Sequence, residues 1–294
     1  MALFGKRPVN TEAQAQAKTD QERLAGGGLP LGAELRLTEI RQSSHFFTSN
    51  LSVNEFALAA SEGLRPLGQV IGSTVYHVGW QYTPMYASQE LTTLSQAQTH
   101  ARHLALSRLQ QEAQLLGAHG VIGVRLERKS YDWGANLIEF AASGTAVALP
   151  DAGPPPQHPF VCALSGQEFY ALRRGGFFPV GFAFGTCTCY HVATQTNQWA
   201  SQSWSNVELI DYSKAISHAR RTAMTRLSKE AAQVGAEGVV GVTIDKYITT
   251  NEVEDVNDQR RLDLIVEFTA LGTAIVADGP NRLTIDYGLP LVDG

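Results

Sequence analysis

The sequence predicts an α+β fold built as two tandem modules, each an antiparallel sheet covered by one long helix plus a short capped helix. The main observation is an internal repeat. Residues 45–72 align with 158–185 at a constant offset of 113, and residues 90–124 align with 208–242 at a constant offset of 118. A repeat of this length indicates a duplicated domain, and each copy is long enough to bury a core of its own.

Each module begins with a short β run and a Ser-x-x-Glu sequence. In that sequence the Ser and Glu side chains hydrogen-bond to free amide groups at a helix start, which is a capping box. A short helix is therefore expected directly after each β run. The β runs are residues 46–51 and 160–164, and the capping boxes are residues 52–55 and 165–168.

A long strand and a long helix follow in each copy. Every fourth residue of the helix is small or apolar, from Ala97 in the first copy and from Ala215 in the second. Such a ridge packs close to a sheet, and a glycine then stops each helix. The strands are expected through residues 70–78 and 182–192, and the helices over 92–116 and 210–234.

A β-hairpin closes each module. Its strands are expected at residues 120–129 with 136–149, and at 238–248 with 262–276. The alignment offset grows from 118 to 128 across the second tip, where Phe268 matches Phe140, so ten residues are inserted there. The insert, within residues 250–261, is acidic and is expected to be a solvated hairpin tip.

The chain therefore divides into five parts. A flexible N-terminal arm, a first module, a proline-rich linker, a second module and a C-terminal tail are expected. They cover residues 1–30, 31–150, 151–159, 160–277 and 278–294.

The motif Gly-Ala-x-Gly-Val-x-Gly-Val, with Ala-Arg before it and Gly-Thr-Ala-Val or Gly-Thr-Ala-Ile after it, resembles the YbjQ-like family, which is often described as heavy-metal-binding. Both copies carry it, so the chain looks like two tandem YbjQ-like modules. The matching residues are Gly68, Gly72, Ala101, Arg102, Gly117 to Val124 and Gly144 to Val147 in the first copy, and Gly181, Gly185, Ala219, Arg220, Gly235 to Val242 and Gly272 to Ile275 in the second.

The resemblance implies a YbjQ/dodecin-like α+β fold and self-association, because that family forms pentameric rings. A tandem chain cannot close one ring of five from whole chains. Five chains could instead close two stacked rings of five modules, one made of first modules and one of second modules. We therefore expect the chain to be its own main partner.

The sequence Cys187-Thr-Cys189-Tyr-His191 is the sharpest chemical feature. Residues two apart on a strand share a face, so two thiols and an imidazole would point the same way, which suits a soft divalent metal. A fourth ligand would have to come from elsewhere in the chain, and His218 and Cys162 are candidates. The alternative is a buried strand whose small Cys side chains pack against the helix.

Other residues are candidates for an interface or a ligand. His100 and His218 recur before the Ala-Arg pair, as a proton or ligand site or as hydrogen-bonding residues at the rim of the sheet. Arg102 and Arg220 recur too, and could clamp a carboxylate of a neighbouring subunit. Arg108 with Glu112 and Arg226 with Glu230 have the spacing of helical ion pairs. Trp80, Trp199 and Trp204 lie in loops, where they could stack on a planar ligand or cover the core.

Composition narrows the function. The net charge is −5 and no basic cluster exceeds a pair, which disfavours nucleic acid. The sequence lacks an apolar segment long enough for a membrane span and the usual nucleophile and zinc-protease motifs. We expect a non-enzymatic, homo-oligomeric structural or binding protein in the cytoplasm. The alternatives are a metal-binding protein that uses Cys187, Cys189 and His191, and a shell that sequesters a small planar ligand.

Overall fold

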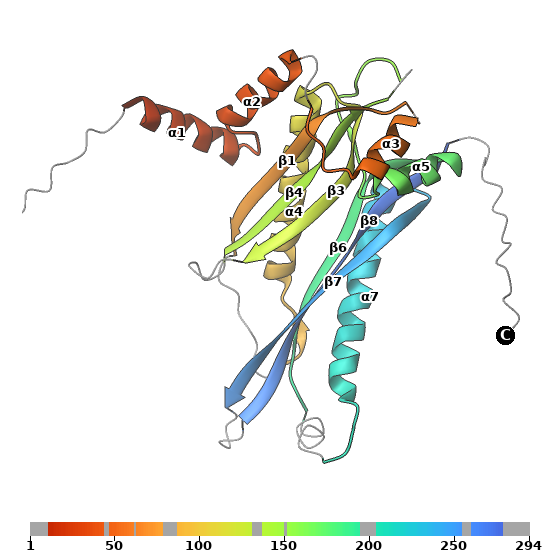
Figure 1. The fold of residues 1–294 in the computed structure, drawn as a ribbon. Coiled ribbons are helices and arrows are strands. Elements are labelled where there is room, and N and C mark those ends of the chain that lie inside the picture. The colour runs from red at the N-terminus through yellow and green to blue at the C-terminus, as the bar shows by residue number, and fades with distance from the viewer. Residues whose placement is uncertain are drawn as a thin grey trace, which may run out of the picture.

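Two sheets, antiparallel except for one short parallel pair in the first, lie side by side, and each is covered by one long helix (Figure 1). This computed structural model describes residues 11–43, 47–61, 63–78, 87–130, 137–149, 152–194, 204–254 and 260–278. The α+β class, the duplication and the long helices and hairpins predicted from the sequence are confirmed.

The two modules repeat the same order of elements. Module 1 contains α3 (Val53–Ser61), β1 (Arg65–His77), α4 (Thr92–Leu115), β3 (Gly120–Ser130) and β4 (Leu137–Ala148). Module 2 contains α5 (Gly166–Arg174), β6 (Phe177–His191), α7 (Ile210–Gln233), β7 (Gly238–Glu254) and β8 (Arg260–Ala277). The remaining elements are α1 (Thr11–Ala25), α2 (Leu31–Gln42), β2 (Gln89–Glu90) and β5 (Phe160–Val161).

Each sheet borrows a short strand from the other module. Sheet A has the order β1-β4-β3-β5, and sheet B has the order β2-β6-β8-β7. Strand β5 precedes module 2 but pairs in parallel with β3 of module 1. Strand β2 precedes α4 of module 1 but pairs antiparallel with β6 of module 2. These two exchanges join the modules through backbone hydrogen bonds.

A glycine marks the point where each long helix crosses its first long strand. A Cβ on Gly72 would stand 2.0 Å from the Ala105 carbonyl oxygen of α4, and a Cβ on Gly185 would stand 2.0 Å from the Ala223 carbonyl oxygen of α7. Both helices therefore lie directly on backbone, which explains why the ridge facing the sheet is rich in alanine.

The short helices form as the Ser-x-x-Glu sequences predict. Ser165 and Glu168 make a complete capping box at the start of α5. At the start of α3, Ser52 and Glu55 exchange the equivalent two hydrogen bonds. Helices α3 and α5 lie side by side across the module boundary (Figure 1).

Two segments differ from the sequence expectation. Residues 160–164 contribute β5, but the equivalent residues 47–51 form no strand, and no strand of the described chain pairs with them. Helix α1 lies in the segment expected as a flexible arm, and α2 lies in the stretch expected as the start of module 1; together they form a helical hairpin beside β1 and α4.

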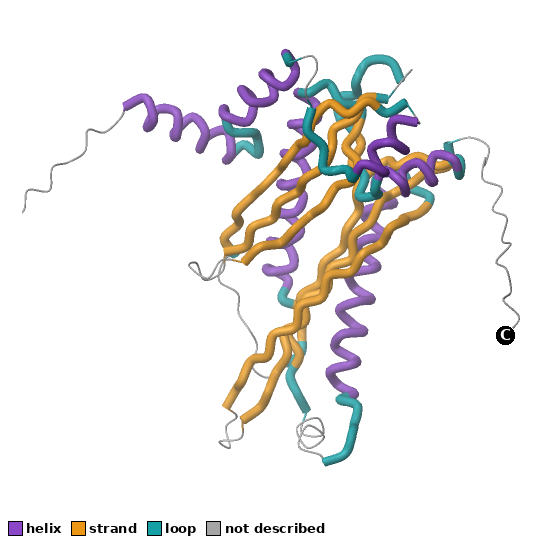
Figure 2. The backbone as a smooth tube through the Cα atoms, in the orientation of Figure 1, coloured by secondary structure: helices purple, strands orange, loops and turns teal. Residues whose placement is uncertain are grey.

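The linker lies against module 1. His119 Nε2 is 3.1 Å from the carbonyl oxygen of Gly153, and Gln110 Nε2 donates to the carbonyl oxygen of Pro159 at 2.7 Å. The β7–β8 hairpin extends past the end of sheet A (Figure 2). The tip of the first hairpin (131–136) and part of the acidic insert (255–259) lie outside the described residues.

Candidate functional site

The contact between the two modules contains a buried ion pair, Arg102 with Glu267. Helix α4 packs on its own sheet with one side and places the other against sheet B, on the face opposite α7. Alternation along β6 sets this arrangement. Cys187 and Cys189 pack with α7. Thr186 and Thr188, which alternate with them along the strand, bond to α4.

Arg102 is the centre of this contact. It is 3% exposed and donates to the hydroxyl oxygens of Thr186 and Thr269 at 2.9 and 3.0 Å. Its guanidinium lies over the Phe140 ring, 4.4 Å from the centroid, and 3.9 Å from Glu267. Burial lowers the pKa of Arg102 to about 10, against the opposing pull of Glu267. The arginine therefore stays charged at neutral pH and joins the two modules.

A second ion pair closes the same contact at the sheet edge. Arg226 of α7 forms two hydrogen bonds of 2.6 and 2.9 Å with Glu90 of β2, and a third of 2.6 Å with the carbonyl oxygen of Thr186. Arg226 does not form the helical pair with Glu230 that its spacing suggests. Only the fold brings Glu90 near, since 136 residues separate it from Arg226.

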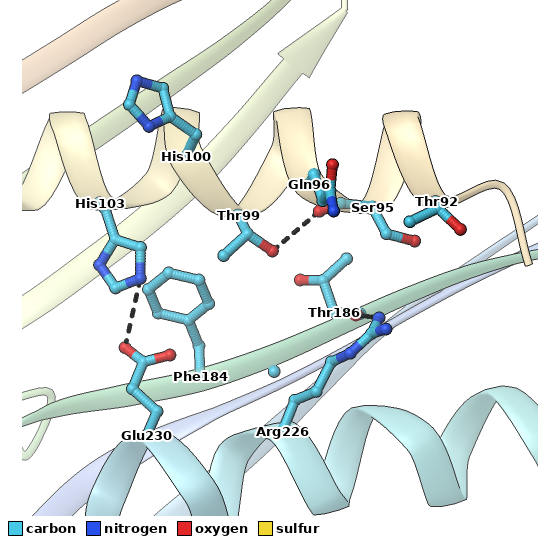
Figure 3. A pocket seen from close by; sticks show the side chains of 11 residues that line it. Thr92, Ser95, Gln96, Thr99, His100, His103, Phe184, Thr186, Arg226 and Glu230 are labelled. Carbon is cyan, nitrogen blue, oxygen red and sulfur yellow. Dashed lines mark hydrogen bonds and ion pairs between the residues drawn. The ribbon is translucent and has the colours of Figure 1, made fainter. Parts of the chain in front are cut away.

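A cavity of about 440 Å³ lies between α4, β6 and α7 (Figure 3). His103 points across it toward Glu230, and their Nε2 and Oε1 atoms are 3.7 Å apart. Burial raises the pKa of Glu230 to about 7. Burial, followed by repulsion from His100, lowers the pKa of His103. Both shifts favour neutral forms, so we interpret the contact as a neutral pair rather than an ion pair.

The Cys-x-Cys-x-His strand is divided between two surroundings. The sulfur atoms of Cys187 and Cys189 are buried and 3.1 Å apart. Their mutual hydrogen bond lowers the pKa of Cys187 and raises that of Cys189. Cys162 is remote from this pair, against Thr273, and burial raises its pKa to about 12.

His191 lies at the open end of the same strand. It lines a cavity of about 290 Å³ together with Cys189 and His218. Its Nδ1 atom is 3.2 Å from the Ser88 hydroxyl, and its Nε2 atom is buried without a hydrogen-bond partner among the described residues. Within the described parts of the chain, no three His, Cys, Asp or Glu side chains are close enough to hold a metal ion.

The other candidates are spread over the molecule. Arg220, the counterpart of Arg102, is exposed on α7, as is His218. His100 is exposed and stands edge-on to the Tyr76 ring at 5.7 Å. Trp204 is fully exposed. Trp80 and Trp199 lie outside the described residues, so the planar-ligand site stays a prediction.

A polar cluster that the sequence did not indicate lies at the far end of β6. Asp263 is fully buried and receives two hydrogen bonds from Arg261, one from the Ala193 amide and one of 2.5 Å from the Tyr190 hydroxyl. Burial raises the pKa of Asp263, but these hydrogen bonds outweigh it and lower the pKa overall. The cluster stabilises the long β6–β8 ladder.

Comparison with known proteins identifies two copies of one family domain. The model of the YbjQ family, whose description reads "Putative heavy-metal-binding", matches residues 65–150 and 199–278. A relative of Mycobacterium tuberculosis, "Encapsulin nanocompartment protein Rv1762c", is 39% identical over 268 residues, which cover 89% of this chain and 97% of the relative.

Shorter relatives align with part of the chain. A UPF0145 protein of Clostridioides difficile is 39% identical over 90 residues, which are 29% of this chain and 79% of the relative. A UPF0145 protein of Halorubrum lacusprofundi is 38% identical over 102 residues, which are 33% of this chain and 95% of the relative. No solved structure matches the chain significantly.

Proposed function

Because the chain belongs to the YbjQ family, we propose that it is a non-enzymatic structural protein that self-associates and takes part in an encapsulin-type nanocompartment. The observation that carries this proposal is the match to a relative named as an encapsulin nanocompartment protein. The chain is 39% identical to that relative, and the match covers 97% of the relative's length. The likeness spans both modules, so it concerns the tandem arrangement as well as the family domain.

Open sheet edges support self-association. On β7 the residues from 241 to 252 are all exposed, including the apolar side chains of Val242, Ile244 and Ile248. A long apolar edge strand is a site where another chain pairs. Exposed apolar side chains that gather on one strand also mark a contact surface.

The cavity between the modules favours a structural role over a catalytic one. Its titratable pair, His103 and Glu230, has pKa shifts toward two neutral groups, whereas a general acid–base pair needs one partner that takes up a proton as the other releases it. Its arginine, Arg226, is committed to Glu90 and to a backbone carbonyl.

The location belongs to the same proposal. No helix in the described ranges is long and apolar enough to cross a membrane, and we propose that the protein assembles in the cytoplasm.

Mass photometry of the purified full-length chain tests the proposal. We expect particles several times the mass of one chain, and we expect a tagged chain to sediment with large protein particles from its source cells. A monomer at micromolar concentration would contradict self-association. An oligomer that stays apart from every large particle would contradict the nanocompartment role.

Soft-metal binding is the second candidate function. The observation that favours it is the buried, unpartnered Nε2 of His191, which shares a cavity with Cys189 and His218. Coordination needs these side chains to move together, because they do not form a metal-sized cluster as they stand.

Elemental analysis of protein kept reduced, with Zn²⁺ or Cu⁺ offered in turn, tests this second function. We expect Cys189→Ser to lose the metal and the matched control Cys162→Ser, a thiol buried elsewhere, to keep it. Equal metal content in the two variants would contradict the site.

A further inference from the structure

The contact between the modules runs in one direction only. Strand β5, at the start of module 2, covers the edge of β3 in module 1. Strand β2 and helix α4, from module 1, cover the edge and the outer face of β6 in module 2. The reverse contact is not made by the described residues, since α7 lies on the far side of sheet B from β1 (Figure 1). A contact of this kind can be repeated from copy to copy.

The edge of β3 that receives β5 within the chain has an uncovered equivalent in module 2, at the edge of β7. Within the chain, Phe160 and Cys162 donate amide hydrogen bonds to the carbonyl oxygens of His119 and Val121. The equivalent acceptors are those of Glu237, just before β7, and Val239 on β7, and no strand of the described chain pairs with that edge of β7.

The segment that forms β5 also has an equivalent, residues 47–51, which lies before α3 of module 1. Residues 47–51 contact their own module just as residues 160–164 contact theirs. The Asn50 amide donates to the Thr145 hydroxyl as the Ala163 amide does to Thr273. Phe47 stacks on Phe56 as Phe160 stacks on Phe169. The segment is therefore held in the orientation of β5, and no strand of the described residues lies beside it.

Two equivalent glycines, Gly120 and Gly238, differ in whether an aromatic ring covers them. A Cβ on Gly120 would stand 2.2 Å from the ring of Phe160, so the position requires glycine. At the equivalent Gly238, the nearest atom to an added Cβ is 3.8 Å away and belongs to Ile275. Nothing in the described chain occupies the space over Gly238. The equivalent ring, that of Phe47, is 40% exposed and belongs in that space in a second copy.

The β2 contact has an uncovered counterpart as well. Val207 and Glu208 stand before α7 as Gln89 and Glu90 stand before α4, and Val207 is 51% exposed. Their partner by equivalence is the open edge of β1, at His77 and Tyr76. Arg108 lies beside this edge and donates to the Ser73 carbonyl oxygen, as Arg226 donates to the Thr186 carbonyl oxygen. The Nε atom of Arg108 is buried and has no hydrogen-bond partner in the described chain.

We propose that module 2 of one copy docks on module 1 of a second copy through these surfaces, head to tail, as the two modules dock within a chain. Residues 47–51 of the second copy extend sheet B at β7, and residues 207–208 of the first copy extend sheet A at β1. Glu208 then pairs with Arg108 across the copies. First and second modules alternate around one ring, unlike the two stacked rings expected from the family.

The α1–α2 hairpin already covers part of the receiving face. The Leu24 carbonyl oxygen accepts a hydrogen bond from Arg108, and Arg36 makes two hydrogen bonds with Glu112. In module 2 the equivalent residues, Arg226 and Glu230, face α4 instead. The hairpin and the incoming α7 therefore compete for the same side of α4, and full docking displaces the hairpin.

One position departs from strict equivalence. Gly166 lets α5 approach α3 so closely that an added Cβ would lie 2.5 Å from the Glu55 carbonyl oxygen. Its counterpart in α3 is Val53, which is 83% exposed. The short helices of neighbouring copies must therefore lie farther apart than those within a chain, with the Val53 side chain between them.

Disulfide trapping tests the inference, which rests on the proposed self-association. By equivalence with Gln89 and Tyr190, Val207 lies opposite His77 of the next copy, and opposed residues on antiparallel strands are near enough to bridge. The double variant Val207→Cys, His77→Cys should give a non-reducing ladder of cross-linked chains whose longest member counts the chains in the ring. Each single variant should stay at the mass of one chain.

If mass photometry shows the double variant to be oligomeric but no cross-linked ladder forms, the head-to-tail contact is overturned and the self-association stands. Monomeric protein would overturn both. As a second variant, Gly238→Ala puts a methyl group where the Phe47 ring must lie, and should weaken association at least tenfold without lowering the Tm of the isolated chain. Gly181→Ala, which meets nothing closer than 3.8 Å, is the matched control, and equal association of the two variants would contradict the inference.

Discussion

Gly185 is the position where the packing of helix on sheet can be measured most directly. An alanine Cβ there would lie 2.0 Å from the Ala223 carbonyl oxygen and 2.5 Å from the Leu227 amide nitrogen, whereas non-bonded carbon atoms prefer a separation of roughly 3.5 Å or more. Both atoms are helix backbone, so no side chain can turn aside. Helix α7 must retreat from β6 by about 1 Å or more to admit the methyl group.

The cost follows from the overpacking of a filled core. Overpacking costs about 1–3 kcal/mol, and an alanine recovers roughly 0.4–1 kcal/mol by restricting the unfolded chain. We expect Gly185→Ala to lose about 1–2 kcal/mol of unfolding free energy, which lowers the Tm of a chain this size by about 2–3 °C.

Thermal and urea unfolding followed by circular dichroism measure this loss. Gly181→Ala on the same strand is the matched control, because the added methyl group makes only ordinary contacts. If Gly185→Ala melted within 1 °C or so of that control, the close approach of α7 to β6 would be refuted.

Three further substitutions should change stability or association in different directions. The pKa of Glu230 is raised to about 7, so its contribution to stability is present below its unfolded pKa and is lost as the pH rises through 7; Glu230→Gln should gain about 1–3 kcal/mol over the native chain at pH 8 and nothing at pH 5 in urea titrations. The pKa of Asp263 is lowered, so its contribution is lost as the pH falls through the folded pKa; Asp263→Asn should cost about 3 kcal/mol at pH 7, with a smaller cost below pH 4, and an equal cost at both would contradict the ionised form. Arg36→Glu repels Glu112 and releases the α1–α2 hairpin, so native mass measurements should show tighter association, whereas Thr38→Glu on the same helix, whose hydroxyl bonds within α2, should leave it unchanged.

The elements that the sequence predicts well are those with local causes. The ridges from Ala97 and Ala215 and the glycines after them delimit α4 and α7 to within a residue or two. The capping box at Ser165 is set by residues three apart. Such signals do not depend on the rest of the chain, so they survive in the fold unchanged.

The contacts that the sequence misses are long-range. Strand β2 is two residues long, with no pattern of its own, and exists because Glu90 meets the edge at Cys189. Arg108 and Glu112 have ideal helical spacing, yet each bonds to backbone and to the N-terminal hairpin instead. The repeat predicts that Arg102 and Arg220 are equivalent; one is buried and the other exposed because only the first has a second module to face.

In the proposed ring, the linker of residues 152–159 makes one of every two module contacts permanent. Free single modules would have to meet at every boundary of a ring, and each meeting would carry its own loss of translational freedom. A tether this short holds its two modules at an effective concentration of the order of millimolar. Dilution can therefore open the joints between chains but not those within them, so disassembly should stop at the intact pair of modules.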